Sequence, residues 1–173
     1  MQLVLLISTF IHSLLIHQAI EILNNNRPHT ESFYKLVVGL DSVKLFIRSN
    51  DINDILKIIE KEISENLAWR SFQRSDKITE ALKMISDEKI WEKISQITKI
   101  KSQDIKEELN LIIKRRDSIV HEADFDVVNR CQYAIDETSA KRSVNFIIKL
   151  AHLIDSIILN YTYNKGSVFK SQI

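Results

Sequence analysis

The sequence contains few of the residues that form tight turns. Only two glycines and one proline occur among its 173 residues. A sheet-rich domain of this length needs many such residues between its strands, so we exclude a sheet-based fold. Isoleucine and leucine instead recur three and four residues apart along most of the chain, which predicts amphipathic helices. We therefore expect an all-α bundle of about five to seven helices, with one domain over residues 1–164 and a loose polar tail over residues 165–173.

The sequence also lacks the residues of disulfides, zinc sites and strongly basic surfaces. Its single cysteine, Cys131, excludes an internal disulfide, and no group of Cys and His residues has zinc-site spacing. We therefore expect no metal and no cofactor, and one free thiol suits a reducing cytoplasm. The 24 Lys and Arg residues nearly cancel the 23 Asp and Glu residues, so only a local basic patch could hold nucleic acid. No phosphate-binding glycine loop, HExxH or GxSxG motif occurs.

The first 23 residues form the longest apolar stretch of the chain. No basic region precedes this stretch and no small-residue cleavage site follows it, so we do not interpret it as a signal peptide. Polar residues such as Ser8, His12, His17 and Glu21 interrupt it too often for a membrane span. We expect a buried core helix and no membrane contact. Because this helix begins at Met1 without a cap, we expect that the chain is an excerpt of a longer protein or begins at an internal start.

The remaining elements are predicted from apolar spacing and from capping residues. In chain order, we expect a loop over 24–29, a helix from Thr30 to about 47 that bends near Gly39, a helix over 52–67 capped by Asp51, a break over 69–74, two short helices capped by Ser75 and Ser86, a helix over 102–123 capped by Ser102, a loop over 124–135, and a helix over 136–164 capped by Asp136. We expect the helices over 102–123 and 136–164 to pack antiparallel.

Arg116 falls near the middle of the apolar stripe of the helix over 102–123. An arginine is seldom buried without a partner, because removing its hydration costs several kcal/mol. Either a core acid such as Glu21 or Asp155 pairs with it, or the stripe faces a wet surface shared with another molecule. Five residues later comes His121, whose side chain type titrates near neutral pH and which could also cap the end of its helix.

These residues resemble a known family. Arg116 and His121, with Asp117 directly after the arginine, are similar to the R-x4-6-H signature of HEPN domains. The surrounding sequence RRDSIVHEAD (residues 115–124) resembles the RiboL-PSP branch of that family. Further residues that carry the resemblance lie upstream, in WRSFQRSDKI (residues 69–78) and at Ala81, Leu82 and Trp91. The resemblance implies a helical bundle that dimerises through the motif helix and cleaves RNA without a metal.

The residue types suit that chemistry. RNA carries its own nucleophile, the 2′-OH, so cleavage needs only a proton-transfer group such as His121 and a cation such as Arg116 on the phosphate. Asp117 could orient His121 or hold Arg116, and Lys114 and Arg115 could contact phosphate, although a solvated face is the plainer interpretation. On a regular helix Arg116 and His121 are separated by about 7.5 Å of rise and about 140° of rotation. Two motif helices about a two-fold axis would bring both pairs into one cleft.

Three functions stay open. The first is an RNA endonuclease of toxin or antiviral-defence type, with RNA, a second copy and either an antitoxin or a fused or associated defence protein as partners. The second is a non-catalytic HEPN module that binds RNA or nucleotide or assembles a larger defence protein. The third is a purely structural helical dimerisation domain. In one toxin branch of the family, a nucleotidyltransferase partner modifies a tyrosine two residues after the histidine. Ala123 occupies that position here, so we do not expect this modification. We interpret His12, His17 and His152 as core or interface residues, and Trp69, Phe72 and Trp91 as packing residues rather than base-stacking platforms.

Overall fold

The computed structural model describes the backbone of residues 2–36, 39–49, 51–121, 125–126, 131–132 and 136–170, and the side chains of residues 6–36, 39–49, 51–120 and 136–160. Within these ranges the chain is helical apart from one short strand pair, which confirms the predicted all-α bundle. In chain order the elements are α1 (Gln2–Leu23), the 3-10 turn η1 (Phe33–Lys35), α2 (Leu40–Arg48), α3 (Ile52–Ala68), α4 (Ser75–Leu82), α5 (Ile90–Thr98), α6 (Ser102–His121), β1 (Phe125–Asp126), β2 (Cys131–Gln132) and α7 (Glu137–Lys170). β1 and β2 pair antiparallel within the predicted 124–135 loop.

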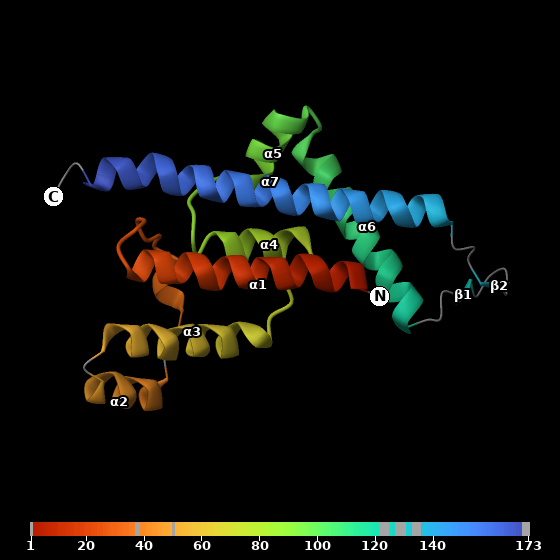
Figure 1. Ribbon diagram of the computed structural model, residues 1–173. Helices are drawn as coiled ribbons and strands as arrows, with labels where there is room; N and C mark the ends of the chain where they lie inside the picture. The colour runs from red at the N-terminus through yellow and green to blue at the C-terminus, as the bar shows by residue number, and fades with distance from the viewer. Residues whose placement is uncertain are drawn as a thin grey trace.

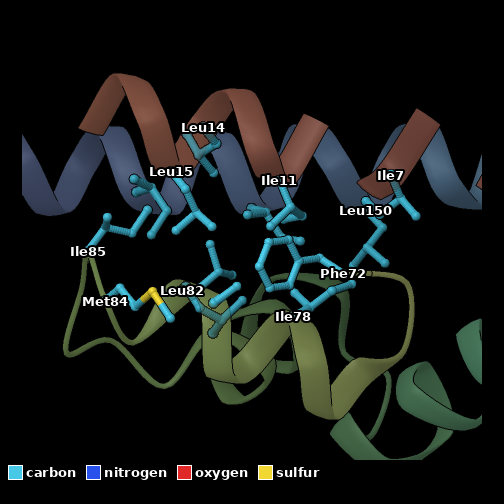
Figure 2. Packing of buried hydrophobic residues seen from close by; sticks show 14 of the residues in the cluster. Ile7, Ile11, Leu14, Leu15, Phe72, Ile78, Leu82, Met84, Ile85 and Leu150 are labelled. Atoms are coloured by element: carbon cyan, nitrogen blue, oxygen red, sulfur yellow. The ribbon is translucent and has the colours of Figure 1, made fainter. Parts of the chain in front are cut away.

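Helix α1 is the centre of the bundle, as its apolar sequence predicts. It packs against α3, α4 and α7 (Figure 1). Ile7, Ile11 and Ala19 are fully buried, and Figure 2 shows the side chains of α1 directed toward Ile78 and Leu82 of α4. By length and apolar composition alone, the segments Leu6–Leu23 and Glu137–Asn160 could each cross a membrane, but a core helix meets the same criteria. Burial of one isoleucine or leucine side chain in this core contributes about 1.5–3 kcal/mol to the free energy of unfolding.

Helix α7 lies along α1 and runs in the same direction (Figure 1). The predicted antiparallel packing of α6 against α7 is wrong. The buried stripe of α7, which includes Ile147, Leu150 and Ile154, packs on α1 and α5, whereas α6 packs on α5 and α4. In Figure 1 the axis of α6 runs across that of α7. An apolar stripe requires a partner but does not select it, and the more apolar α1 takes this place.

The ends of several helices differ from the prediction. A loose tail was expected from residue 165, but helix α7 continues to Lys170. The segment contains no proline to interrupt the backbone hydrogen bonds of a helix. Helix α6 is described to His121, and its predicted end near residue 123 stays a prediction because residues 122–124 lie outside the described residues. The helix expected from Thr30 to 47 is divided into η1 and α2. Thr30 still acts locally, since its Oγ1 accepts a hydrogen bond from the backbone N of Phe33 at 3.1 Å.

Two predicted caps are confirmed. Asp51 Oδ1 accepts a hydrogen bond from Asn53 N at 2.9 Å, and Asp136 accepts from Thr138 N and Ser139 N at 3.0 Å each. These bonds satisfy backbone donors that have no partner inside the helix. Ser102, which was predicted as the cap of α6, is instead the first residue of that helix.

Two other predicted caps are displaced. Ser75 is the first residue of α4 rather than its cap. Ser86 accepts a hydrogen bond from Glu88 N at 3.1 Å, but α5 begins only at Ile90. Both serines therefore lie near the predicted helix starts without capping them.

The N-terminus of α2 is capped from another helix. Its N-cap residue, Gly39, has no side chain to offer. Glu62 of α3 supplies the acceptor instead, taking hydrogen bonds from Gly39 N at 3.1 Å and from the Ser42 hydroxyl. The Ser42 and Gly39 hydrogen bonds lower the pKa of the Glu62 carboxyl. This contact joins α2 to α3.

Candidate functional site

The segment between α3 and α4 is held against α1 by one aromatic side chain. Phe72 is 2% exposed and points into the core in Figure 2. Its backbone N donates a hydrogen bond to Ser8 Oγ at 3.2 Å, and its ring lies 4.8 Å from that of His12. The ring nitrogen Nε2 of His12 is 2.9 Å from the carbonyl oxygen of Leu67 at the end of α3. These contacts fix the backbone on both sides of Arg70.

The motif helix α6 is joined to α4 by a reciprocal pair of hydrogen bonds. Ser75 N donates to Asn110 Oδ1, and Asn110 Nδ2 donates to Ser75 Oγ, each at 3.2 Å. Residues Ile113 and Asp117 follow Asn110 by three and seven positions, so all three lie on one side of α6. The pair therefore turns that side of the motif helix toward the start of α4.

A pocket of about 540 Å³ opens where these elements meet. Its lining combines the α3–α4 segment, the first turns of α4 and one side of α6. The residues that line it are Arg70, Ser71, Phe72, Gln73, Arg74, Lys77, Glu80, Ile113 and Asp117. Both stretches that carry the family resemblance therefore contribute to the wall of this pocket, residues 69–78 through five side chains from Arg70 to Arg74 and through Lys77, and residues 115–124 through Asp117.

Arg116 is bound by its own neighbour. Its Nη1 donates to Asp117 Oδ1 at 2.9 Å, with the two side chains 24% and 38% exposed. The predicted alternative of a pairing with Glu21 or Asp155 is wrong for this ion pair, because the acid that meets Arg116 is Asp117. The Nε atom of Arg116 is buried and has no hydrogen-bond partner among the described side chains. The guanidinium is therefore partly exposed, with Asp117 as its ion-pair partner and its Nε turned away from solvent.

The apolar stripe of α6 changes along the helix. Leu109 and Ile113 are buried, whereas Ile119 and Val120 are 42% and 41% exposed. The helices that pack on α6 are α4 and α5, and they leave these two side chains uncovered. The end of the motif helix therefore presents apolar side chains to solvent.

The charges of the pocket are unequally paired. Lys77 Nζ and Glu80 Oε2 form an ion pair at 2.9 Å, and this hydrogen bond raises the pKa of Lys77 and lowers the pKa of Glu80. Arg70 and Arg74 are exposed. Neither of them has an ion-pair partner among the side chains that the structure describes. The pocket therefore offers two guanidinium groups to an anion.

The predicted site residues do not all meet at this pocket. Asp117 lines it and Arg116 is bound to Asp117. Lys114 and Arg115 are exposed on α6 and do not line the pocket. His121 is the last residue of α6, and its side chain lies outside the described residues. The geometry of the Arg116–His121 pair therefore stays a prediction.

Arg70, Arg74 and Lys77 were not predicted as site residues. The sequence does show three cations around one aromatic residue within residues 70–77. This pattern was interpreted only as part of the family resemblance and not as a binding site. The prediction that the aromatic residues serve packing is correct for Phe72 and Trp91, which are 2% and 3% exposed.

The same prediction is wrong for Trp69, which is 94% exposed. It follows the last helical residue of α3, at a place where no neighbouring element covers it. Among the predicted core or interface histidines, His12 is partly buried, whereas His17 and His152 are exposed.

In the described part of the chain, no group of three or more His, Cys, Asp and Glu residues could hold a metal ion. Comparison of the chain with models of known families, with curated proteins and with solved structures finds no match.

Proposed function

We propose that this chain is a metal-independent RNA endonuclease of toxin or antiviral-defence type, in the manner of the HEPN domains that its motif resembles. One observation carries the proposal: residues 70–74, Lys77 and Asp117 line one pocket, and Arg116 is bound to Asp117. The two stretches are some forty residues apart in sequence. Their meeting gives the resemblance a spatial basis that the spacing of Arg116 and His121 alone does not have.

The proposed reaction needs no added nucleophile. The 2′-oxygen of one ribose forms a bond to the adjacent phosphorus while the bond from phosphorus to the 5′-oxygen breaks. The products are a 2′,3′-cyclic phosphate and a 5′-hydroxyl end. The 2′-OH loses a proton and the leaving 5′-oxygen gains one, and His121 is the residue we propose for one of these transfers.

Arg116 would stabilise the charge that builds on the phosphate oxygens. A guanidinium has five N–H donors in a planar fork, and Asp117 occupies one of its terminal nitrogens. The other N–H donors of its terminal nitrogens are proposed to meet two phosphate oxygens, whereas the buried Nε takes no part. Asp117 would then act as a positioning residue that restrains Arg116. Lys114 and Arg115, exposed on the same helix, are proposed to contact RNA outside the pocket.

A second copy of the chain is the partner proposed to complete the site. On a regular helix, positions 116 and 121 are separated by about 140° of rotation, so we expect one copy alone to be a poor site. The exposed Ile119 and Val120 at the end of α6 supply apolar surface for a two-fold contact. We propose a homodimer that acts in the cytoplasm, with an antitoxin or an associated defence protein as a further partner.

The experiment that tests the activity uses labelled RNA in the presence of EDTA. Wild-type protein should cleave it and leave 2′,3′-cyclic phosphate ends. His121→Ala should lower the rate by about 10²–10⁴-fold, the usual effect of losing an acid–base group. His152→Ala, an exposed histidine on α7, is the matched control and should cleave like wild type. Cleavage that survives in His121→Ala, or that EDTA abolishes, overturns the proposal.

The dimer is tested separately by mixing variants. Light scattering of the wild type should give twice the mass of the chain at micromolar concentration. Inactive His121→Ala and inactive Arg116→Ala should regain partial activity when mixed, because a mixed dimer re-forms one intact pair across the axis. A monomeric mass, or no recovery in mixed dimers that have been shown to form, contradicts the shared site.

A further inference from the structure

Trp69 is the most exposed aromatic side chain that the structure describes. It is 94% exposed, whereas Trp91 is 3% exposed and donates a hydrogen bond from Nε1 to Thr79 Oγ1 at 2.6 Å. Tryptophan normally buries most of its large ring. The backbone that carries Trp69 is nevertheless fixed, because Leu67 before it and Phe72 after it are 1% and 2% exposed. Trp69 is therefore an aromatic ring held in solvent by a rigid support.

Trp69 directly precedes, in the sequence, the residues that give the pocket its cations. Arg70 directly follows it, and Arg70 and Arg74 line the pocket without an ion-pair partner among the described side chains. Lys77 is already paired with Glu80. An exposed aromatic beside unpaired guanidinium groups matches the two repeating parts of a single strand, a base with a flat face and a phosphate with negative charge.

We propose that Trp69 stacks on a base of single-stranded RNA, while Arg70 and Arg74 bind the adjoining phosphates and lead the strand into the pocket beside Asp117. That the strand is RNA rests on the proposed function. A duplex fits this surface less well, because its bases already stack on one another and do not present a face to Trp69. Trp69 is a binding residue in this proposal and takes no part in proton transfer.

The test measures binding without cleavage. A fluorescein-labelled 2′-O-methyl RNA oligonucleotide has no free 2′-OH and cannot be cut. Its dissociation constant is measured by anisotropy for the wild type and for Trp69→Leu. Loss of one base–aromatic stack should weaken binding by about 5- to 150-fold. Tyr34→Leu is the matched control, since Tyr34 is 70% exposed on η1 and lines no part of the pocket. It should bind like wild type.

The two tryptophans provide a second readout. Unlabelled oligonucleotide should quench the tryptophan emission of the wild type, because the exposed ring stacks on a base. It should leave the emission of Trp69→Leu unchanged, because the remaining Trp91 is buried. Arg70→Ala and Arg74→Ala should each weaken binding to single strand and duplex alike. Each should also reduce the salt slope of the binding constant by about 0.7, the value for one phosphate contact on a single strand.

Two outcomes overturn the proposal. One is a Trp69→Leu variant that binds the oligonucleotide with wild-type affinity, together with wild-type protein whose tryptophan emission is not quenched by saturating oligonucleotide. The other is a Trp69→Leu variant that loses its dimer mass in light scattering, which would assign Trp69 to a protein interface. The cleavage assay separates this inference from the proposed function. If the protein cleaves RNA but Trp69→Leu binds it as tightly as wild type, only this inference is wrong. If binding depends on Trp69 but the protein cuts no RNA, only the proposed activity is wrong.

Discussion

Replacing Arg116 with alanine separates a structural role of this cation from a catalytic one. The Arg116–Asp117 pair has an N–O distance of 2.9 Å, and its side chains are 24% and 38% exposed. An ion pair with this much solvent contact contributes about 0.2–1 kcal/mol to stability. The buried Nε of Arg116 has no partner among the described side chains, so no further hydrogen bond is lost there. We expect Arg116→Ala to lower the free energy of unfolding by about 1 kcal/mol.

The expected effect on activity is much larger. Loss of one electrostatic contact to the transition state costs about 10²–10³-fold in rate. A domain with a stability of about 5 kcal/mol that loses 1 kcal/mol stays more than about 99% folded. Unfolding would therefore explain almost none of the lost rate. Arg116→Lys should recover little of it, because an ammonium group lacks the fork that binds two oxygens.

Two assays on the same protein samples test this separation. Urea unfolding followed by circular dichroism gives the stability, and labelled RNA in EDTA gives the rate. Arg48→Ala is the control, since Arg48 lies exposed at the end of α2 and lines no part of the pocket. It should change neither quantity much. A stability loss above about 3 kcal/mol in Arg116→Ala would favour a structural cation. An unchanged cleavage rate would refute the catalytic role directly.

Two further predictions concern the supports of the site. Phe72→Ala should lower the free energy of unfolding by about 3–5 kcal/mol, as for other buried aromatics. A loss below about 1 kcal/mol in urea unfolding would mean that Phe72 does not hold the α3–α4 segment. Hydrogen bonds from Ser42 and Gly39 lower the pKa of Glu62 below its ordinary value of 4.5, so the charged form stabilises the folded protein. Glu62→Gln should therefore be less stable than wild type near pH 7, and the difference should shrink as the pH falls through the lowered pKa. A stability difference that is the same at pH 7 and pH 3 would contradict this.

Caps formed by local hydrogen bonds were predictable from the sequence. Asp51 and Asp136 accept from backbone N–H groups two or three residues ahead of them, and such bonds need no tertiary contact. The cap that Glu62 provides to α2 was not predictable, because its acceptor lies 23 residues from Gly39. A pattern of residues can reveal that a helix start needs an acceptor, but not which distant side chain supplies it.

The apolar stripes were predictable in the same limited sense. Their spacing identified the core helix α1 and the buried face of α7. It did not identify the partner of each stripe, so α6 was expected against α7 instead of α4 and α5. Trp69 illustrates a related limit, since an aromatic residue type suits both a core and a binding surface. Only the ending of α3 at Ala68 and the burial of Phe72 determine that this ring faces solvent.

The weakness of the Arg116–Asp117 pair suits the role proposed for it. A deeply buried ion pair resists separation, because either charge left alone there would be strongly destabilising. This pair is partly exposed, so a phosphate could replace or share Asp117 at Arg116 without exposing an unpaired buried charge. Until then, Asp117 restrains the guanidinium beside the pocket that the same carboxylate lines. The acids first considered, Glu21 and Asp155, are not fully buried, and the acid that Arg116 contacts is Asp117. The position of its partner on the pocket wall is therefore the feature that most favours a functional Arg116.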